Sequence, residues 1–139
     1  MSRVDFYILS DSAATAREQF ACRLVAKAAG LSNRVHVLLD NESTLDALDT
    51  LLWTFSDDSF VAHDRWPDDD IAASVTLGLS QDGIPEGADV CVNLSDTLVS
   101  DDCARVAEIV AADEVARAAG RQRFAEYRDR SAEMNTFKL

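Results

Sequence analysis

Short apolar runs alternate along this chain with longer segments whose apolar residues recur every three or four positions. The first pattern predicts buried β-strands, and the second predicts amphipathic helices that pack on them. The strand candidates are residues 3–9, 34–39, 59–63, 73–79, 89–94 and 105–111. The helix candidates are residues 12–29, 43–55 and 113–130. Strands that alternate with helices predict an α/β fold, a three-layer sandwich around a mostly parallel sheet.

The length of 139 residues and the 47% hydrophobic content fit a single domain, residues 1–139, with a core of its own. Arg3 and Asp5 interrupt the apolar run at the N-terminus, so we expect neither a signal peptide nor a membrane span, and we expect a cytoplasmic protein. Three cysteines without a Cys-x-x-Cys pair favour reduced thiols over a disulfide framework or a zinc site.

Folds of this class often bind nucleotides at the carboxyl ends of their strands. The first loop of the chain, residues 10–15, contains neither a glycine nor a lysine. It therefore supplies neither a backbone cradle for phosphate nor a lysine that reaches one. We predict a nucleotide-binding-like fold without a phosphate loop and without a cofactor. A small nucleotide- or phosphate-binding α/β enzyme is the alternative function.

The residues that carry catalytic or metal chemistry are sparse. His36 lies within an apolar run, which is typical of a hydrogen-bonded core or edge histidine, and His63 precedes Asp64. No serine or cysteine stands in a nucleophile-elbow sequence, so we expect no catalytic residues. The aspartates at 57–58, 68–70 and 101–102 lack the spacing of a calcium loop, so we interpret them as solvated loops and expect no metal site.

Positive charge is concentrated near the C-terminus of a strongly acidic chain. Residues 117–138 hold six basic and three acidic side chains, a net charge of +3, whereas the rest holds seven basic and 22 acidic ones, a net charge of −15. The acidic part would repel duplex DNA and anionic membranes. The asymmetry predicts a local site for a small anion or an acidic peptide.

The final helix candidate carries most of this positive charge on one face. At about 100° per residue, Arg117, Arg121, Phe124 and Arg128 lie within roughly 60° of one another. Two interpretations fit this face. Arginines beside an aromatic ring suit a ligand with a carboxylate and an apolar side chain, but a solvated basic face is also favoured near a helix C-terminus. A separate stripe, Ala116, Gly120 and Tyr127, is suited to packing on the sheet.

Aromatic residues gather in the middle of the chain, at Trp53, Phe55, Phe60 and Trp66. A local core cluster is one interpretation. Because Asp57 and Asp58 lie among them, burying all four rings is difficult, and an exposed patch for a protein partner is the other interpretation.

Three motifs, taken in order and at suitable spacing, resemble the chi subunit family of bacterial DNA polymerase III holoenzyme. They are the opening Asp5-Phe-Tyr-Ile-Leu9, the central Leu52-Trp53 followed by Asp57-Asp-Ser-Phe-Val-Ala-His63, and the terminal Arg121-x-Arg-Phe-x-x-Tyr-Arg128 with Asn135-Thr136. The resemblance spans almost the whole chain.

The resemblance implies a non-catalytic accessory subunit in the cytoplasmic, nucleoid-associated replisome. It implies a link between the clamp loader and the single-stranded-DNA-binding protein, whose acidic C-terminal tail ends in an apolar pair and a free carboxylate. Contact with the clamp loader and with DNA is then mainly indirect, and the assembled holoenzyme is the DNA-directed DNA polymerase, a nucleotidyltransferase. No membrane contact is implied.

The resemblance also implies site residues. The tail would be bound by Arg117, Arg121, Phe124, Arg128, Asn135 and Thr136, with Tyr127 supporting the helix. Ala125 stands where relatives carry a lysine, which implies a weaker hold on the tail.

A second surface is implied at Trp53, Phe55, Phe60 and Val61, for the psi subunit or a helicase. Here Ala62 precedes His63 where family members often carry a proline.

Overall fold

The computed structural model describes residues 3–57, 60–67 and 71–139. Its elements are β1 (Arg3–Ile8), α1 (Ala16–Gly30), β2 (Val35–Leu39), α2 (Glu42–Thr54), β3 (His63–Trp66), β4 (Val75–Leu79), η1 (Ser80–Asp82), β5 (Val90–Asn93), β6 (Arg105–Val110), α3 (Glu114–Asp129) and β7 (Glu133–Lys138). Asp58 and the aspartates at 68–70, which we interpreted as parts of solvated loops, lie outside the described residues.

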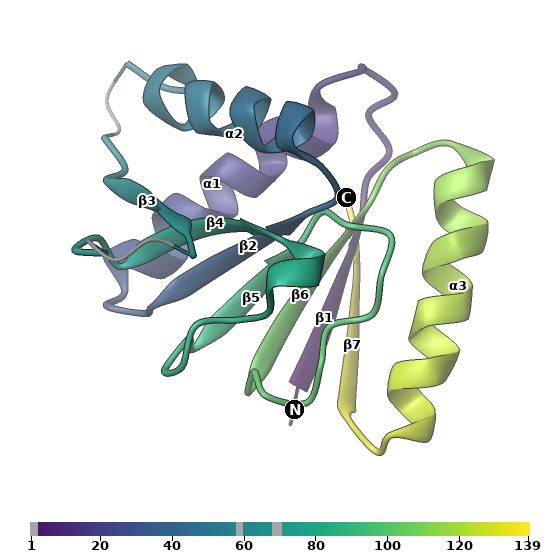
Figure 1. Ribbon diagram of the computed structural model, residues 1–139. Coiled ribbons are helices and arrows are strands. Elements are labelled where there is room, and N and C mark those ends of the chain that lie inside the picture. Colours follow the sequence, from purple (N-terminus) through teal and green to yellow (C-terminus); the bar gives the residue numbers. More distant parts are fainter. Residues whose placement is uncertain (1–2, 58–59, 68–70) are drawn as a thin grey trace.

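Within the described residues, the strands form one seven-stranded sheet in the order β3-β4-β2-β5-β6-β1-β7, and every pairing is parallel. Helices α1 and α2 cover one face of this sheet, and α3 lies on the other (Figure 1). The arrangement confirms the predicted α/β three-layer sandwich.

Each face of the sheet has its own hydrophobic core, because successive strand residues point to opposite faces. Val37 of β2 and Leu48 of α2 are buried in the core beneath α1 and α2. Phe6 of β1 and Tyr127 of α3 are buried in the core beneath α3. The stripe predicted to pack on the sheet is confirmed, since Gly120 is also buried and Ala116 packs against the same core.

Side-chain caps fix the starts of two helices. The Asn41 side chain accepts a hydrogen bond from the Thr44 amide at 2.9 Å and caps α2, and Asp113 accepts from the Ala116 amide at 2.8 Å and caps α3. Helix α1 begins at Ala16, later than predicted. The chain before it forms a turn in which the Asp11 side chain accepts from the Ala13 amide at 2.9 Å, because short polar side chains compete with helix hydrogen bonds.

The predicted strand over residues 59–63 is wrong in its boundaries, because β3 occupies His63–Trp66. Val61 is buried while Phe60 is 76% exposed, so this apolar pair marks an extended segment that packs only one side chain against the core. The strand that follows is polar because it forms an edge of the sheet and pairs only with β4.

Strand β7 was absent from the predicted elements. Helix α3 ends at Asp129, Ser131 adopts a left-handed backbone conformation with φ 64°, and the chain then returns beside β1. Glycine is the residue that usually marks such a helix end. With serine there, the sequence gives no clear sign that a strand follows.

Candidate functional site

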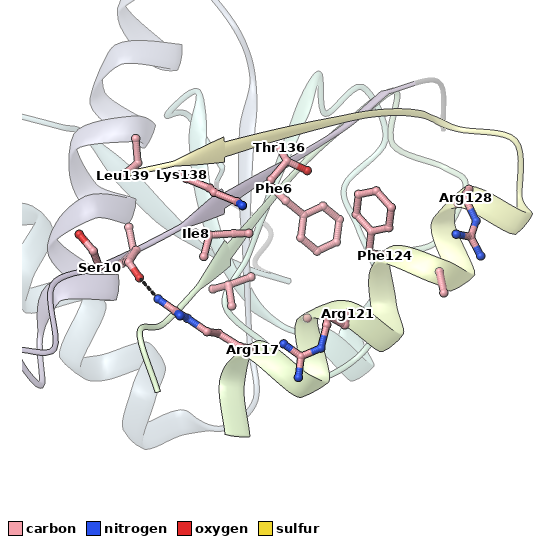
Figure 2. A pocket seen from close by; sticks show the side chains of 14 residues that line it. Phe6, Ile8, Ser10, Arg117, Arg121, Phe124, Arg128, Thr136, Lys138 and Leu139 are labelled. Carbon is pink, nitrogen blue, oxygen red and sulfur yellow. Dashed lines mark hydrogen bonds between the residues drawn. The ribbon is translucent and has the colours of Figure 1, made fainter. Parts of the chain in front are cut away.

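The arginine-rich face of α3 borders a cavity of about 560 Å³ that opens between α3 and the end of the sheet formed by β1, β6 and β7. Arg117, Arg121, Phe124 and Arg128 all line it, as their helical spacing predicted (Figure 2). We call this space the α3 cavity. Its lining residues are Phe6, Ile8, Leu9, Ser10, Val110, Arg117, Gly120, Arg121, Phe124, Ala125, Arg128, Thr136, Lys138 and Leu139.

The α3 cavity combines an apolar floor with cationic side chains. Phe6 and Ile8 of β1 and Val110 of β6 contribute the floor. The Phe124 ring projects from α3 toward the sheet beside Phe6 (Figure 2). The two rings pack edge-on, with centroids 5.3 Å apart. Lys138 at the end of β7 adds a fourth cation to the three arginines. Such a space can receive an apolar side chain while the surrounding cations bind carboxylates.

Arg117 differs from the other cations of the α3 cavity in its burial. Its Nη2 donates a hydrogen bond to the Leu9 carbonyl at 3.3 Å, while its Nε is buried and has no hydrogen-bond partner among the described residues. A buried donor without an acceptor is costly. Because this Nε is buried, the Arg117 side chain would have to turn toward the cavity for an anionic ligand to supply the acceptor.

Arg121 and Arg128 are largely exposed, and their ion-pair partners in the described part of the chain are acids on the helix surface. Arg121 contacts Glu114 at 2.8 Å, and Arg128 contacts Asp129 at 3.7 Å. Exposed ion pairs of this kind contribute little free energy. Both guanidinium groups can therefore exchange their surface partner for a carboxylate of a ligand.

The two polar residues predicted from β7 lie on opposite faces of the sheet. Thr136 lines the α3 cavity. Asn135 points to the other face, where its Nδ2 donates to Asp5 Oδ1 at 3.1 Å. Neighbouring residues of a strand alternate between faces, so the structure does not bring these two side chains together.

Tyr127 has no exposed surface and lies beneath α3. Its hydroxyl donates to Glu108 Oε2 at 2.7 Å and accepts from the Val99 amide at 2.9 Å. Burial raises the pKa of this hydroxyl, and the charge of Glu108 adds to the effect. Tyr127 thus attaches the helix to the sheet without lining the α3 cavity.

Sequence reasoning missed Lys138 and the apolar floor. Residues 133–138 show no alternation of apolar and polar residues that would predict a strand. Lys138 lies on the face of Thr136 because β7 pairs with β1 and strand residues alternate between faces.

The second predicted surface lies at the other end of the sheet, on α2 and the segment before β3. Trp53 is 46% exposed and Phe60 is 76% exposed, and their ring centroids are 5.0 Å apart. Phe55 is half-buried and Val61 is buried, and both pack against the core. The exposed patch therefore consists of Trp53 and Phe60, and we call it the Trp53/Phe60 patch.

His63 supports this patch from below. Its ring lies 4.5 Å from that of Trp53, its Nδ1 donates to the Val61 carbonyl at 2.8 Å, and its Nε2 lies 2.6 Å from Asp49 Oδ1. Burial alone would raise the pKa of Asp49, but hydrogen bonds from His63 and Arg65 hold that pKa below its usual value. Asp49 thus orients His63, whereas the adjacent Asp64 accepts hydrogen bonds from the amides of Ala72 and Ala73.

Among the described residues, no group of three or more His, Cys, Asp or Glu side chains is placed to hold a metal ion. In the same part of the chain, no helix is both long enough and apolar enough to cross a membrane.

Comparisons with known proteins identify the fold and the family of this chain. The likeness to the crystal structure of T4 UvsW concerns the fold alone, with a TM-score of 0.65, 10% sequence identity, and coverage of 98% of this chain and 41% of that one. The DNA polymerase III subunit chi of Pseudomonas aeruginosa is 34% identical over 145 residues, which cover 100% of this chain and 98% of that protein. Residues 1–135 match the family described as "DNA polymerase III chi subunit, HolC". The chain therefore belongs to the DNA polymerase III chi subunit family.

Proposed function

We propose that this chain is a non-catalytic adaptor that links the clamp loader of DNA polymerase III to the single-stranded-DNA-binding protein. The contact is made by binding the acidic C-terminal tail of the single-stranded-DNA-binding protein. Membership of the chi subunit family gives the chain an accessory role in DNA replication. The observation that carries the finer proposal is the set of cations around the apolar floor of the α3 cavity.

The chemistry of such a tail matches the α3 cavity in two respects. Its apolar end group fits the floor beside Phe124, and its carboxylates fit the surrounding cations. The residues outside 117–138 carry a net charge of −15. This charge repels polyanions that do not fit the α3 cavity. A short acidic peptide is therefore favoured over bare DNA, and DNA is reached mainly through the protein that coats it.

The three arginines have proposed roles. Arg121 or Arg128 pairs with the terminal carboxylate, because both are exposed and their ion-pair partners among the described residues lie on the helix surface. Arg117 binds an aspartate upstream in the tail, which would supply the acceptor that its buried Nε lacks. Thr136 lines the cavity from the opposite side and adds a hydroxyl near the peptide.

The proposal is tested by fluorescence anisotropy of a labelled C-terminal peptide from the organism's own single-stranded-DNA-binding protein, titrated with this chain. Arg121→Glu and Arg128→Glu should each weaken binding by at least about 1.5–3 kcal/mol, the free energy of a charged hydrogen bond. Phe124→Ala should also weaken it through lost apolar contact.

The matched control is Arg34→Glu, which reverses one exposed charge at the start of β2, away from the α3 cavity. It should leave the affinity for the peptide unchanged, whereas amidation of the terminal carboxylate of the peptide should reduce it. Equal affinity of Arg121→Glu, Arg128→Glu and the unmodified chain would contradict the assignment of the cavity.

A second contact is proposed at the Trp53/Phe60 patch, with the psi subunit or a helicase as partner. Two large apolar rings that remain exposed beside each other support it, because exposed aromatic side chains are characteristic of the centres of protein interfaces. Val61 and Phe55 would contribute by holding the patch in place from the core.

A further inference from the structure

One buried carboxylate, outside the lining of the α3 cavity, joins α3 to the sheet. Glu108 lies within β6 and is 0% exposed. Its Oε1 accepts a hydrogen bond from Arg123 Nε at 3.1 Å, and its Oε2 accepts from the Tyr127 hydroxyl and from Asn93 Nδ2, both at 2.7 Å. Three donors thus converge on this one side chain.

Two of these three donors belong to α3 and lie four residues apart, so they project from the same side of the helix. The residues that line the α3 cavity project from a neighbouring side of the same helix. If α3 rotated or slid, the charge-assisted contacts of Arg123 and Tyr127 with Glu108 would break. The contacts to Glu108 therefore set the direction in which Arg117, Arg121, Phe124 and Arg128 point.

Stability alone gives little reason for a charge at this position. Burial raises the pKa of Glu108, although Arg123 and the other donors oppose this effect, so ionisation of Glu108 is costly. Buried ion pairs often contribute less to stability than apolar residues of similar size would, but they can select a single arrangement. The geometry of Glu108 corresponds to such a selecting role.

We propose that Glu108 is the positioning residue of the α3 cavity, holding α3 through Arg123 and Tyr127 in the one rotation that presents the cations and Phe124 to a ligand. This inference rests on the proposed binding of an acidic peptide tail. The inference goes beyond that proposed function because Glu108 does not contact the peptide.

The sign of the effect of Glu108→Gln separates positioning from simple electrostatics. The substitution removes a negative charge close to a site for an acidic peptide, so charge alone predicts tighter binding. Loss of positioning predicts weaker binding, by about tenfold if the equivalent of one charged hydrogen bond is lost. Glu126→Gln is the matched control, because it makes the same chemical change at an exposed position of α3 and should leave the affinity unchanged or slightly higher.

Two further readouts distinguish positioning from general destabilisation. In Glu108→Gln, hydrogen exchange should quicken at the amides of α3 while those of β2 and β5 stay protected. The wild-type affinity for the labelled peptide should also fall as the pH is lowered through the raised pKa of Glu108, and this step should be absent from Glu108→Gln. The groups facing Glu108 are Arg123 and Tyr127 of α3 and Asn93 of β5, none of which titrates at mildly acidic pH.

The outcomes separate the two proposals. Absence of peptide binding by the wild-type chain would refute tail binding, while the exchange experiment would still test whether Glu108 holds α3. Wild-type binding together with equal affinity and an equal pH profile in Glu108→Gln would overturn the positioning role. If Glu108→Gln does not fold, Tyr127→Phe is the second variant, because it removes one donor to Glu108 together with the acceptor of the Val99 amide. It should weaken peptide binding and loosen α3, and unchanged affinity in this variant would overturn the role in the same way.

Discussion

At the scale of single residues, the polar side chains inside the sheet are as informative as the apolar ones. His36 lies in β2 with no exposed surface, and its Nδ1 is 2.7 Å from Thr76 Oγ1. This confirms the prediction of a hydrogen-bonded histidine in an apolar strand. Its ring packs against Gly78, where a Cβ would lie 2.9 Å from His36 Cε1, so glycine is required at that strand position by close approach.

His36 should make stability depend on pH. Burial lowers its pKa from 6.5 to about 4. Between these two pKa values, the imidazole of His36 binds a proton in the unfolded chain but not in the folded chain. The free energy of unfolding therefore falls as the pH drops from about 6.5 towards about 4, by up to about 1.4 kcal/mol per pH unit. Urea unfolding across that range should show this slope, and His36→Asn should flatten it. An equal slope in the variant would assign the effect to other groups.

At the scale of elements, one close contact governs how near α3 lies to the sheet. Gly120 faces Val110 of β6, and a Cβ at Gly120 would lie 3.1 Å from Val110 Cγ2. Val110 is buried and has little room to move. A small residue at this position lets the helix approach the sheet, while Tyr127 and Phe124 pack against Phe6 one to two turns later.

Gly120→Ala should test this approach. Alanine favours helices over glycine by about 1 kcal/mol, but overpacking against a buried side chain costs about 1–3 kcal/mol. We expect a net loss of stability together with weaker binding of the acidic peptide, measured by urea unfolding and by anisotropy. Ala118→Gly, at an exposed position of the same helix, isolates the helix propensity. A gain in stability for Gly120→Ala would show that Val110 yields and that the contact does not set the position of α3.

At the scale of the whole molecule, the two candidate surfaces lie at opposite edges of the sheet. Strand β7, beside the α3 cavity, forms one edge, and β3, beside the Trp53/Phe60 patch, forms the other. The cavity and the patch share no residue and are built on different helices. This separation suits an adaptor that holds two partners at once.

The two surfaces should therefore act independently, because mutations without shared partners have additive effects. Trp53→Glu should abolish binding of the partner proposed for the Trp53/Phe60 patch, psi or a helicase, and leave the affinity for the acidic peptide unchanged. Arg121→Glu should weaken binding of the peptide and leave the binding of that partner unchanged. Isothermal titration of the peptide into chain already saturated with the other partner should give the same affinity as titration into free chain. Competition between the two partners would contradict this separation.

The features that follow from neighbouring residues could be predicted from the amino-acid sequence. Alternating apolar runs and helical periodicity predicted the α/β sandwich, and the spacing of Arg117, Arg121, Phe124 and Arg128 predicted their common face. A helix turns by about 100° per residue whatever surrounds it, so the face shared by these residues follows from their numbers alone. The sequence also predicts an aromatic cluster that includes Trp53 and Phe60, but the pattern does not show which residues of the cluster are exposed.

Features that depend on contacts between distant segments became visible only in the folded chain. Strand β7 exists because β1 offers it a pairing edge, and that pairing brings Lys138 and Thr136 to the α3 cavity and turns Asn135 away from it. In the sequence, Glu108 only interrupts an apolar strand. Its role follows from the hydrogen bonds that Arg123 and Tyr127 donate to its carboxylate in the folded chain. Strand pairing and the burial of a charge stabilise the fold only when partners that are distant in the sequence come into contact. A local sequence pattern does not identify those partners.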